Sequence, residues 1–168
     1  MTEPGPGQVR VRVISAGVSP TDLKIRSGEV PFASPPDGVL GFEAAGVVDA
    51  LGPSVTGVAE GDEVASLLLA LGGYAEYALA SSWTPKPPKV TWGDAAGLPA
   101  AAEAAMGTLK QLRLAAGETL LVLGAAGSVG MIATQLAVSR GAMVIGAVAS
   151  LCLSLAVLDL PASARTAP

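Results

Sequence analysis

Three glycines that recur every third residue are the feature of this sequence best suited to chemistry. Gly124, Gly127 and Gly130 follow the apolar run 120–123 and lead into a helical pattern of apolar residues. A strand, a glycine-rich turn and a helix N-terminus are the parts that bring the pyrophosphate of a dinucleotide against backbone N–H groups. There the first glycine permits a tight turn, the second lets the backbone approach the phosphates, and the third packs helix on strand. The residues predicted to bind the cofactor are Gly124, Ala125, Ala126, Gly127, Ser128, Val129 and Gly130.

The residues after the glycine motif complete a strand–helix–strand unit. A second apolar run spans 143–148, and Arg140 and Gly141 before it are typical of a helix end. The unit has about thirty residues, the length that a crossover between parallel strands requires. A plain connection that only packs a strand on a helix is the alternative interpretation. The other common phosphate loop is excluded, because no Lys-Ser or Lys-Thr follows Gly130.

Two residue types that carry much enzyme chemistry are absent or nearly so. The chain has no histidine and one cysteine, Cys152. Without histidine, a Ser-His-Asp or Cys-His mechanism cannot be built within one chain, and neither can a four-ligand Cys/His zinc site. Cys152 stands in an apolar run, so we expect a buried, inert thiol rather than a nucleophile. A single cysteine forms no disulfide within the chain, which fits a reducing cytoplasm.

The composition is typical of a folded globular protein of one or two domains. Of the 168 residues, 51% are hydrophobic and 14% are charged, and the net charge is −4. This balance argues against nucleic acid as a partner, and no cluster of basic residues suits an anionic membrane surface. Residues 1–7 have neither the basic region nor the apolar core of a signal peptide, so we expect a cytoplasmic protein.

Short strand patterns dominate the first half of the chain. They cover residues 8–14, 43–51, 63–65 and 72–79. Glycine- and proline-containing turns separate them, which predicts a small β-barrel or curled sheet. Tyr74 and Tyr77 are expected to pack within the last of these strands.

Two helix starts can be predicted from capping residues. Ser19 suits the N-cap, Pro20 the first helical position and Asp22 the position that completes a capping box. For Ser19, capping is our main interpretation, and contact with a substrate is the alternative. A similar pattern begins at Thr91, and the Ala-rich stretch after it predicts a helix that runs to Leu114.

A change of composition marks a domain boundary. Residues 83–89 contain three prolines in four positions, which make a stiff connection. We therefore predict one domain over residues 1–90 and a second over residues 91–150. Residues 151–168 form an atypical apolar tail.

Several short motifs follow one another in a fixed order along the chain. They are Pro-Gly-Pro-Gly-Gln-Val (4–9), Ala-Gly-Val-Ser-Pro-Thr-Asp (16–22), Gly-Phe-Glu-Ala-Ala-Gly-Val-Val (41–48), Gly-Asp-Glu-Val (61–64), Gly-Gly-Tyr-Ala-Glu-Tyr (72–77), Ala-Ala-Gly-Leu-Pro (95–99) and Gly-Ala-Ala-Gly-Ser-Val-Gly (124–130). In this order and spacing, the chain resembles the medium-chain dehydrogenase/reductase superfamily. It is similar in particular to the zinc-independent branch of quinone oxidoreductase-like and enoyl-reductase-like proteins.

The resemblance implies a β-rich GroES-like barrel followed by an incomplete α/β Rossmann domain, a doubly wound parallel sheet. Substrate would bind in the cleft between them. Zinc-dependent relatives place a cysteine and a histidine where this sequence has Ser19 and Phe42, which are poor zinc ligands. Their cysteine-rich structural zinc lobe would fall between Val64 and Tyr74, where no cysteine stands. The resemblance therefore implies no metal.

The resemblance also implies a reductase in which NADPH delivers hydride to a quinone or to the β-carbon of an enone. The cofactor supplies the hard chemistry, so a site without histidine can work through alignment and hydrogen bonds. Ser19 and Asp22 are the candidate catalytic residues, and both would act by positioning. Close relatives carry a threonine that faces the nicotinamide where this chain has Ala104. Thr108 could replace it only with a change of helix register.

The choice of cofactor depends on the end of the second Rossmann strand. NAD sites usually carry Asp or Glu about twenty residues past the glycines, where it binds the ribose diol. In this sequence no acidic residue stands between Gly130 and Asp159, which disfavours NAD. We therefore predict NADP(H), with Ser150 as a contact of the 2′-phosphate.

The family pattern ends after Ser150. A complete Rossmann domain has about six strands, and only the first strand–helix–strand unit is present, so we expect a truncated product. Two strands and one crossover would leave apolar surface and an unpaired strand edge, which would lead to aggregation or to a homodimer. Two other functions stay open. One is a non-catalytic remnant that at most binds nucleotide, and the other is a membrane-anchored fragment, because residues 141–158 carry no charge.

Overall fold

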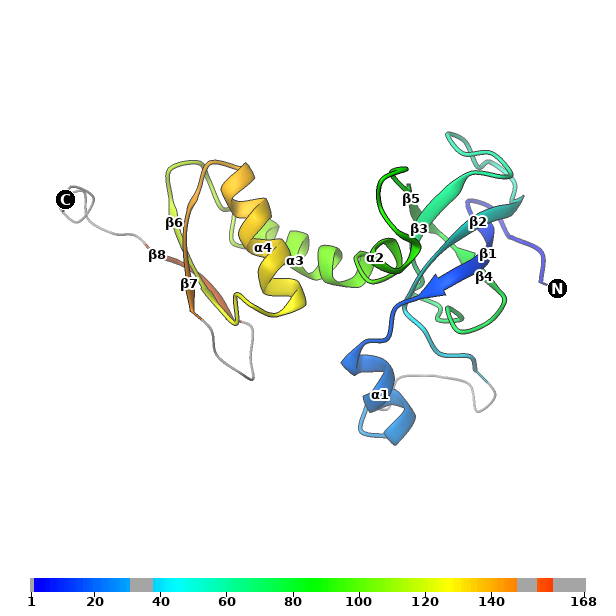
Figure 1. Ribbon diagram of the computed structural model, residues 1–168, viewed down its shortest axis with the longest axis horizontal. Helices are drawn as coiled ribbons and strands as arrows, with labels where there is room; N and C mark the ends of the chain where they lie inside the picture. The colour runs from blue at the N-terminus through cyan, green and yellow to red at the C-terminus, as the bar shows by residue number, and fades with distance from the viewer. Residues whose placement is uncertain (1, 31–37, 148–153, 159–168) are drawn as a thin grey trace. The chain divides into compact units, whose positions relative to one another are not determined.

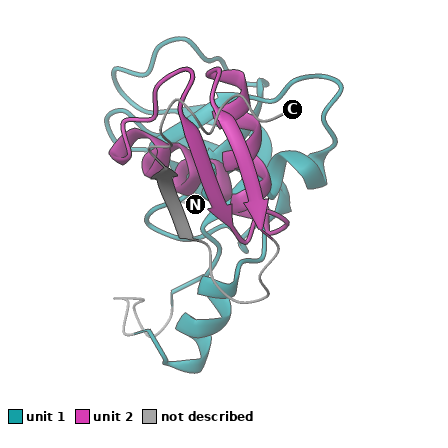
Figure 2. Cartoon of the chain, turned by 90° about the vertical axis from the view of Figure 1, so that its left-hand side faces the viewer, with its two compact units in different colours: residues 1–100 teal, residues 101–168 magenta. Residues whose placement is uncertain are grey.

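The computed structural model describes residues 2–30, 38–147 and 154–158. Contacts divide the chain into two compact units, residues 1–100 and residues 101–168 (Figure 2). The elements, labelled in Figure 1, are β1 (Val9–Ala16), α1 (Pro20–Ser27), β2 (Glu43–Leu51), β3 (Glu63–Leu67), β4 (Tyr77–Ala80), β5 (Ser82–Pro85), α2 (Trp92–Ala96), α3 (Pro99–Gln111), β6 (Thr119–Leu123), α4 (Ser128–Ser139), β7 (Met143–Ala147) and β8 (Ser154–Leu158).

The first unit is built on an antiparallel sheet of five strands in the order β4-β1-β2-β3-β5. Strand β1 illustrates how the sequence pattern produces a strand of this sheet. Val9 and Val11 are fully buried, whereas Arg10 and Arg12 reach solvent. This alternation turns one face of the strand toward a core. The core residues of the sheet are Val9, Val11, Ala44, Val48, Val64, Leu68, Ala78 and Ala80.

Helix α1 begins at the predicted capping box. The Ser19 side chain accepts from the N–H of Asp22, and the Asp22 side chain accepts from the N–H of Ser19. The helix ends at Gly28, whose φ of 78° lies in the left-handed region that glycine adopts without strain. Both ends of α1 are therefore set by local sequence.

Two helices, rather than the single helix predicted, follow residue 91. Helix α2 ends at Gly97 and α3 begins at Pro99. Pro99 explains the break, because proline lacks an N–H and disfavours helical backbone at the residue before it. Helix α2 packs on the antiparallel sheet through the cluster of Ala45, Ala65, Ala95 and Ala96.

The second unit contains a sheet of three strands in the order β7-β6-β8. Strands β6 and β7 are parallel and α4 connects them, which confirms the predicted strand–helix–strand unit. Helices α3 and α4 lie on the same face of this sheet (Figures 1 and 2). They form a core with β6 that consists of Leu109, Leu120, Val122, Ala137 and Ala142.

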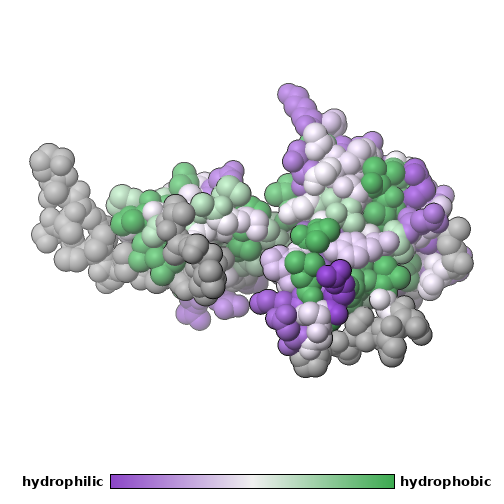
Figure 3. Space-filling view, turned by 60° about the horizontal axis from the view of Figure 1, so that its bottom comes forward, coloured by the Kyte–Doolittle hydropathy of each residue, from purple (hydrophilic) through white to green (hydrophobic). Residues whose placement is uncertain are grey.

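The opposite face of the same sheet carries exposed apolar side chains. On β7, Met143 is 53% exposed and Ile145 is 46% exposed. Because side chains alternate along a strand, these two point away from Val144, which packs against the helix-side core. Figure 3 shows that hydrophobic side chains, in green, are present at the surface of the molecule. The apolar surface predicted for an open sheet is therefore present.

The structure corrects one predicted strand and adds another. The strand predicted over residues 72–79 begins only at Tyr77, because turns and bends occupy the residues before it and Leu71 and Gly72 have positive φ. Strand β8 pairs antiparallel with β6, and no pattern in the sequence predicts it.

The part of the chain that the structure describes contains no helix long and apolar enough to cross a membrane. Within the uncharged run 141–158, the described residues include strands β7 and β8. Ser150 and Cys152 lie outside the described residues, so the roles expected of them stay predictions.

Candidate active site: the glycine loop and the Asp22 cluster

The glycine loop, residues 124–130, connects the end of β6 to the first turn of α4. Gly124 has a φ of 80°, which residues with a side chain rarely adopt. Its N–H donates to the carbonyl oxygen of Ala147 at 2.8 Å, and the N–H of Ala125 donates to the same oxygen at 3.1 Å. The loop therefore turns tightly and is fixed to the end of β7.

Gly130 and Gly127 differ in the room around them. A Cβ at Gly130 would overlap the carbonyl oxygen of Gly124 and lie 2.9 Å from the Cα of Ala125. Only glycine lets α4 pack so closely on the loop, as predicted for the third glycine. A Cβ at Gly127 would meet the Gly124 oxygen at 3.4 Å, an ordinary contact. The fold itself does not require glycine at residue 127.

The first turn of α4 presents backbone donors. The N-cap residue is Gly127, so no side chain at this position accepts a hydrogen bond from the first turn. Among the residues that the structure describes, the N–H groups of Ser128, Val129 and Gly130 have no backbone acceptor, as is usual for a helix start. Unpaired donors at the positive end of a helix dipole suit an anion such as a phosphate. The loop thus has the chemistry for a pyrophosphate, and its cofactor contacts stay a prediction.

Asp22 is the centre of a second polar group, termed the Asp22 cluster, which consists of Ser19, Asp22, Gly41, Glu43 and Tyr74. Asp22 is only 2% exposed. Its Oδ2 accepts from Ser19 N at 2.9 Å and from Ser19 Oγ at 2.8 Å, and its Oδ1 accepts from Gly41 N at 3.1 Å. Hydrogen bonds therefore satisfy the buried carboxylate and join the start of α1 to the chain before β2.

The two residues that the sequence nominates for catalysis bind each other. Ser19 Oγ donates to Asp22 and accepts from the Asp22 N–H at 3.4 Å. The hydroxyl thus serves as the N-cap, which confirms our main interpretation of Ser19. A hydroxyl has one hydrogen to donate, so Ser19 could donate to a substrate only after leaving Asp22. A direct contact with substrate stays a prediction.

Glu43, on β2, is a buried carboxyl whose role the sequence did not reveal. Its Oε2 accepts from Ala100 N at 2.8 Å, so a side chain 57 positions away caps the start of α3. A side chain at Gly17 would overlap Glu43, so the glycine at this position leaves room for the Glu43 side chain. Burial raises the pKa of Glu43, and the charge of Asp22 adds to this, whereas the hydrogen bond from Ala100 opposes it.

Tyr74 joins the cluster from the turn before β4. The Tyr74 side chain is 42% exposed. Its partial burial, together with the nearby negative charge of Asp22, raises the pKa of Tyr74 to about 12. The backbone just before Tyr74 packs closely on the backbone at Gly41, which places Tyr74 near the cluster. Gly41 has a φ of 106°, and a Cβ there would lie 2.8 Å from the Cα of Gly73. The prediction that Tyr74 packs within a strand is wrong. The glycine pair 72–73 was the available signal for a turn.

Two other candidate groups contribute less. Thr108 Oγ1 donates to the carbonyl oxygen of Ala104 at 2.8 Å, so its hydroxyl is engaged within α3. No three His, Cys, Asp or Glu side chains in the described ranges come together in a way that could hold a metal ion.

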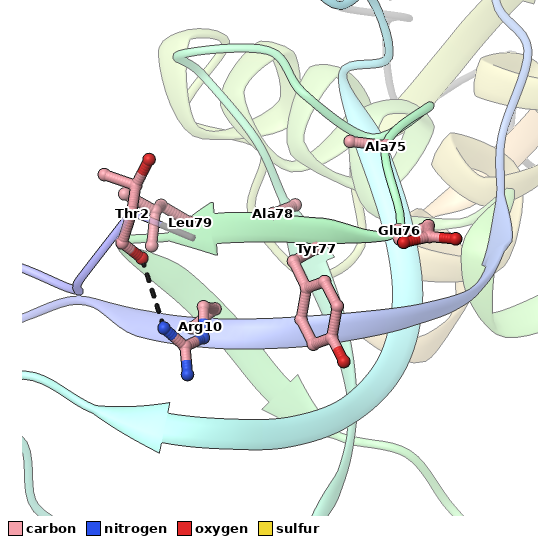
Figure 4. Close-up of a pocket in the computed structure, with 7 residues that line it drawn as sticks. All are labelled: Thr2, Arg10, Ala75, Glu76, Tyr77, Ala78 and Leu79. Atoms are coloured by element: carbon pink, nitrogen blue, oxygen red, sulfur yellow. Dashed lines mark hydrogen bonds between the residues drawn. The ribbon is translucent and has the colours of Figure 1, made fainter.

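A pocket of about 340 Å³ lies beside β1 and β4 in the first unit (Figure 4). Arg10 lines it, and its guanidinium is engaged by Asp49 at 2.6 Å and by Glu3 at 3.3 Å. It also donates to the carbonyl oxygen of Thr2, the bond drawn in Figure 4. No residue of the glycine loop or the Asp22 cluster lines this pocket, so the pocket is separate from the candidate site.

Comparison with known proteins gives a consistent result. The family model of the alcohol dehydrogenase GroES-like domain matches residues 5–148. The quinone oxidoreductase of Sus scrofa is 37% identical over 147 residues, which cover 85% of this chain and 44% of that protein. The chloroplastic NADPH-dependent alkenal/one oxidoreductase of Arabidopsis thaliana is 36% identical over 141 residues, 77% of this chain and 36% of that protein. The structure of Escherichia coli quinone oxidoreductase complexed with NADPH is similar with a TM-score of 0.72 at 32% identity, over 87% of this chain and 45% of that chain.

An antiparallel β unit followed in the chain by a strand, a glycine loop, a helix and a parallel strand is the arrangement of the medium-chain dehydrogenases and reductases. The chain belongs to the alcohol dehydrogenase GroES-like family within that superfamily, and it is a quinone oxidoreductase-like member. The resemblance and the fold class predicted from the sequence are confirmed. The chain spans less than half the length of these relatives.

Proposed function

We propose that the protein is a zinc-independent, NADP(H)-dependent oxidoreductase that transfers hydride to a quinone or an α,β-unsaturated carbonyl. The observation that carries this proposal is the glycine loop, with a tight turn at Gly124 and unpaired backbone donors at the start of α4. The names of the pig and Arabidopsis relatives support the reaction class.

In this proposal the loop binds the pyrophosphate of the cofactor. The N–H groups of Ser128, Val129 and Gly130 would donate to its oxygens. Gly127 would let the phosphate approach the backbone, because a methyl group there would stand in its place. When bound, the cofactor supplies the hydride from its nicotinamide.

The preference for NADP(H) over NAD(H) is supported by the end of β7. The sequence contains no acidic residue between Ala147 and Asp159 that could bind the ribose diol. The Arabidopsis relative is named as NADPH-dependent, and the E. coli relative was solved with NADPH. Ser150 is proposed as a contact of the 2′-phosphate.

The Asp22 cluster is proposed to shape the substrate side of the site. Asp22 would position Ser19 without transferring a proton, because its carboxylate already accepts three hydrogen bonds. Ser19 would polarise the substrate carbonyl by turning its hydroxyl hydrogen away from Asp22. Ser19 and Phe42 stand where zinc-dependent relatives place ligands, and their poor ligand chemistry supports a reaction without zinc.

We also propose a cytoplasmic homodimer. The exposed side chains of Met143 and Ile145 support self-association, and the single cysteine of the sequence supports a reducing compartment. The net charge of −4 supports a small-molecule substrate rather than nucleic acid.

Titration of the purified chain with NADPH and NADH, followed by fluorescence, tests the proposal. We expect saturable binding that favours NADPH. Gly127→Ala should weaken binding of NADPH by about tenfold or more, or about 1.4 kcal/mol, because its methyl group would meet the phosphate. The fold should tolerate this methyl group. Gly93→Ala is the matched control, since Gly93 lies on α2 and has room for a Cβ.

Equal affinity of the parent and Gly127→Ala chains for NADPH would contradict the nucleotide site. Oxidation of NADPH with a quinone or an enone is the second measurement. Binding without turnover would favour the alternative function, a non-catalytic chain that only binds nucleotide. One observation keeps this alternative open: the hydroxyl hydrogen of Ser19 is engaged by Asp22.

A further inference from the structure

Strand β6 is paired along both of its edges. On one side it pairs with β7 in parallel, from Thr119 opposite Met143 to Leu123 opposite Ala147. On the other side it pairs with β8 in the antiparallel direction, from Thr119 opposite Leu158 to Leu123 opposite Ser154. Both pairings cover the whole of β6, so β6 is the central strand of the sheet.

The direction of β8 differs from what a dinucleotide-binding sheet contains at this place. In such a sheet the first strand lies between the second and the fourth, and all of them are parallel. A parallel strand needs a crossover of about a dozen residues or more, usually with a helix. Only residues 148–153 separate β7 from β8. A strand that follows β7 so soon and lies beyond β6 therefore runs antiparallel.

We propose that residues 154–158 are a built-in edge strand that occupies the outer edge of β6 and keeps other strands from pairing there. Two parallel strands alone form a marginal sheet with two open edges. Pairing with β8 satisfies the backbone groups along the outer edge of β6. A strand from another molecule would therefore reach β6 only by displacing β8.

The sequence of the tail suits this role. Residues 154–158 contain no charge, no glycine and no proline, the residues that weaken pairing. Asp159 and Pro161 follow directly in the sequence, and both are residues that end strand pairing. The stretch able to pair is thus as long as β6 itself, residues 119–123.

Disulfide trapping in the whole 168-residue chain tests this proposal. In a background with Cys152→Ser, the variant L121C/A156C places two cysteines directly opposite each other in the observed register. Directly opposite residues bring their Cβ atoms within reach of a disulfide. We expect nearly complete formation of a disulfide within one chain under mild oxidation. The control L121C/L155C is one residue out of register, and its yield should be about tenfold lower.

A second in-register pair, L123C/S154C, covers the case in which L121C/A156C does not fold, with circular dichroism as the check. A high yield within one chain for an in-register pair, together with a low yield for the control, supports the proposal. Equal yields for in-register and out-of-register pairs overturn it. Disulfides that form between two chains also overturn it, because β8 would then complete the sheet of a second copy.

Discussion

Two buried carboxylates connect separate segments of the first unit, and each leads to a prediction. Asp22 accepts hydrogen bonds from Ser19 at the start of α1 and from Gly41 before β2. Asp22→Ala leaves these donors without an acceptor and should lower the free energy of unfolding by about 3 kcal/mol. Asp22→Asn keeps one acceptor oxygen and should lower it by less. Urea unfolding followed by circular dichroism measures both, and equal midpoints for parent and Asp22→Ala would show that the cluster carries no stability.

Glu43 should make stability depend on pH. Because burial raises the pKa of Glu43, the folded chain binds a proton more tightly than the unfolded chain does at pH values between 4.5 and the raised pKa. This stabilising contribution is complete below the ordinary value of 4.5 and is lost as the pH rises through the raised pKa. Glu43→Gln is neutral and can still accept from Ala100, so it should flatten this part of the profile. Urea unfolding at a series of pH values from about 4 to 8 measures the effect.

The control for this experiment is Glu60→Gln, which makes the same change of charge on an exposed side chain. It should keep the pH profile of the parent chain. If Glu43→Gln and Glu60→Gln change the profile equally, the effect comes from net charge and not from the burial of Glu43.

Among the elements, those with local signals were predictable from the sequence. The capping box at Ser19 and the turn at Gly124 each depend on residues within a few positions, and both form as expected. The break before Pro99 also has a local signal, which the Ala-rich pattern obscured. Local chemistry thus accounts for where these helices begin and end.

Contacts between distant segments were not predictable in the same way. The cap that Glu43 provides for α3 joins residues 57 positions apart. Tyr74 lies close enough to Asp22 to feel its charge, and the close packing of Gly41 on Gly73 brings together two segments that are distant in the sequence. Strand β8 lacks the alternation that marks a half-buried strand, so only its pairing with β6 reveals it.

The junction of the glycine loop with α4 gives a prediction at the scale of the element. A Cβ at Gly130 would overlap the Gly124 carbonyl, so Gly130→Ala should lower the free energy of unfolding by about 1–3 kcal/mol. Gly107→Ala is the matched control on α3, where a Cβ meets nothing, and it should raise stability by up to about 1 kcal/mol. Urea unfolding separates the two. A Gly130→Ala chain as stable as its parent would mean that the helix can shift away from the loop.

In the whole molecule, the two compact units differ in how completely they cover their sheets. The first unit encloses its own core, whereas in the described part of the second unit both helices, α3 and α4, cover the same face of the sheet. Parallel sheets normally have both faces covered. The domain boundaries at residues 90 and 150 stay proposals, because contacts group residues 91–100 with the first unit.

The open face of the second sheet should cause self-association. Ile145→Lys places a charge on that face, where the side chain is 46% exposed, and should shift the chain toward monomer without a loss of stability. Val138→Lys makes the same chemical change on α4, at a side chain that is 57% exposed, and should leave association unchanged. Sedimentation velocity at several concentrations measures both. If the two variants associate to the same extent, the contact between copies lies elsewhere on the molecule, and the apolar face of β7 is not the surface that brings them together.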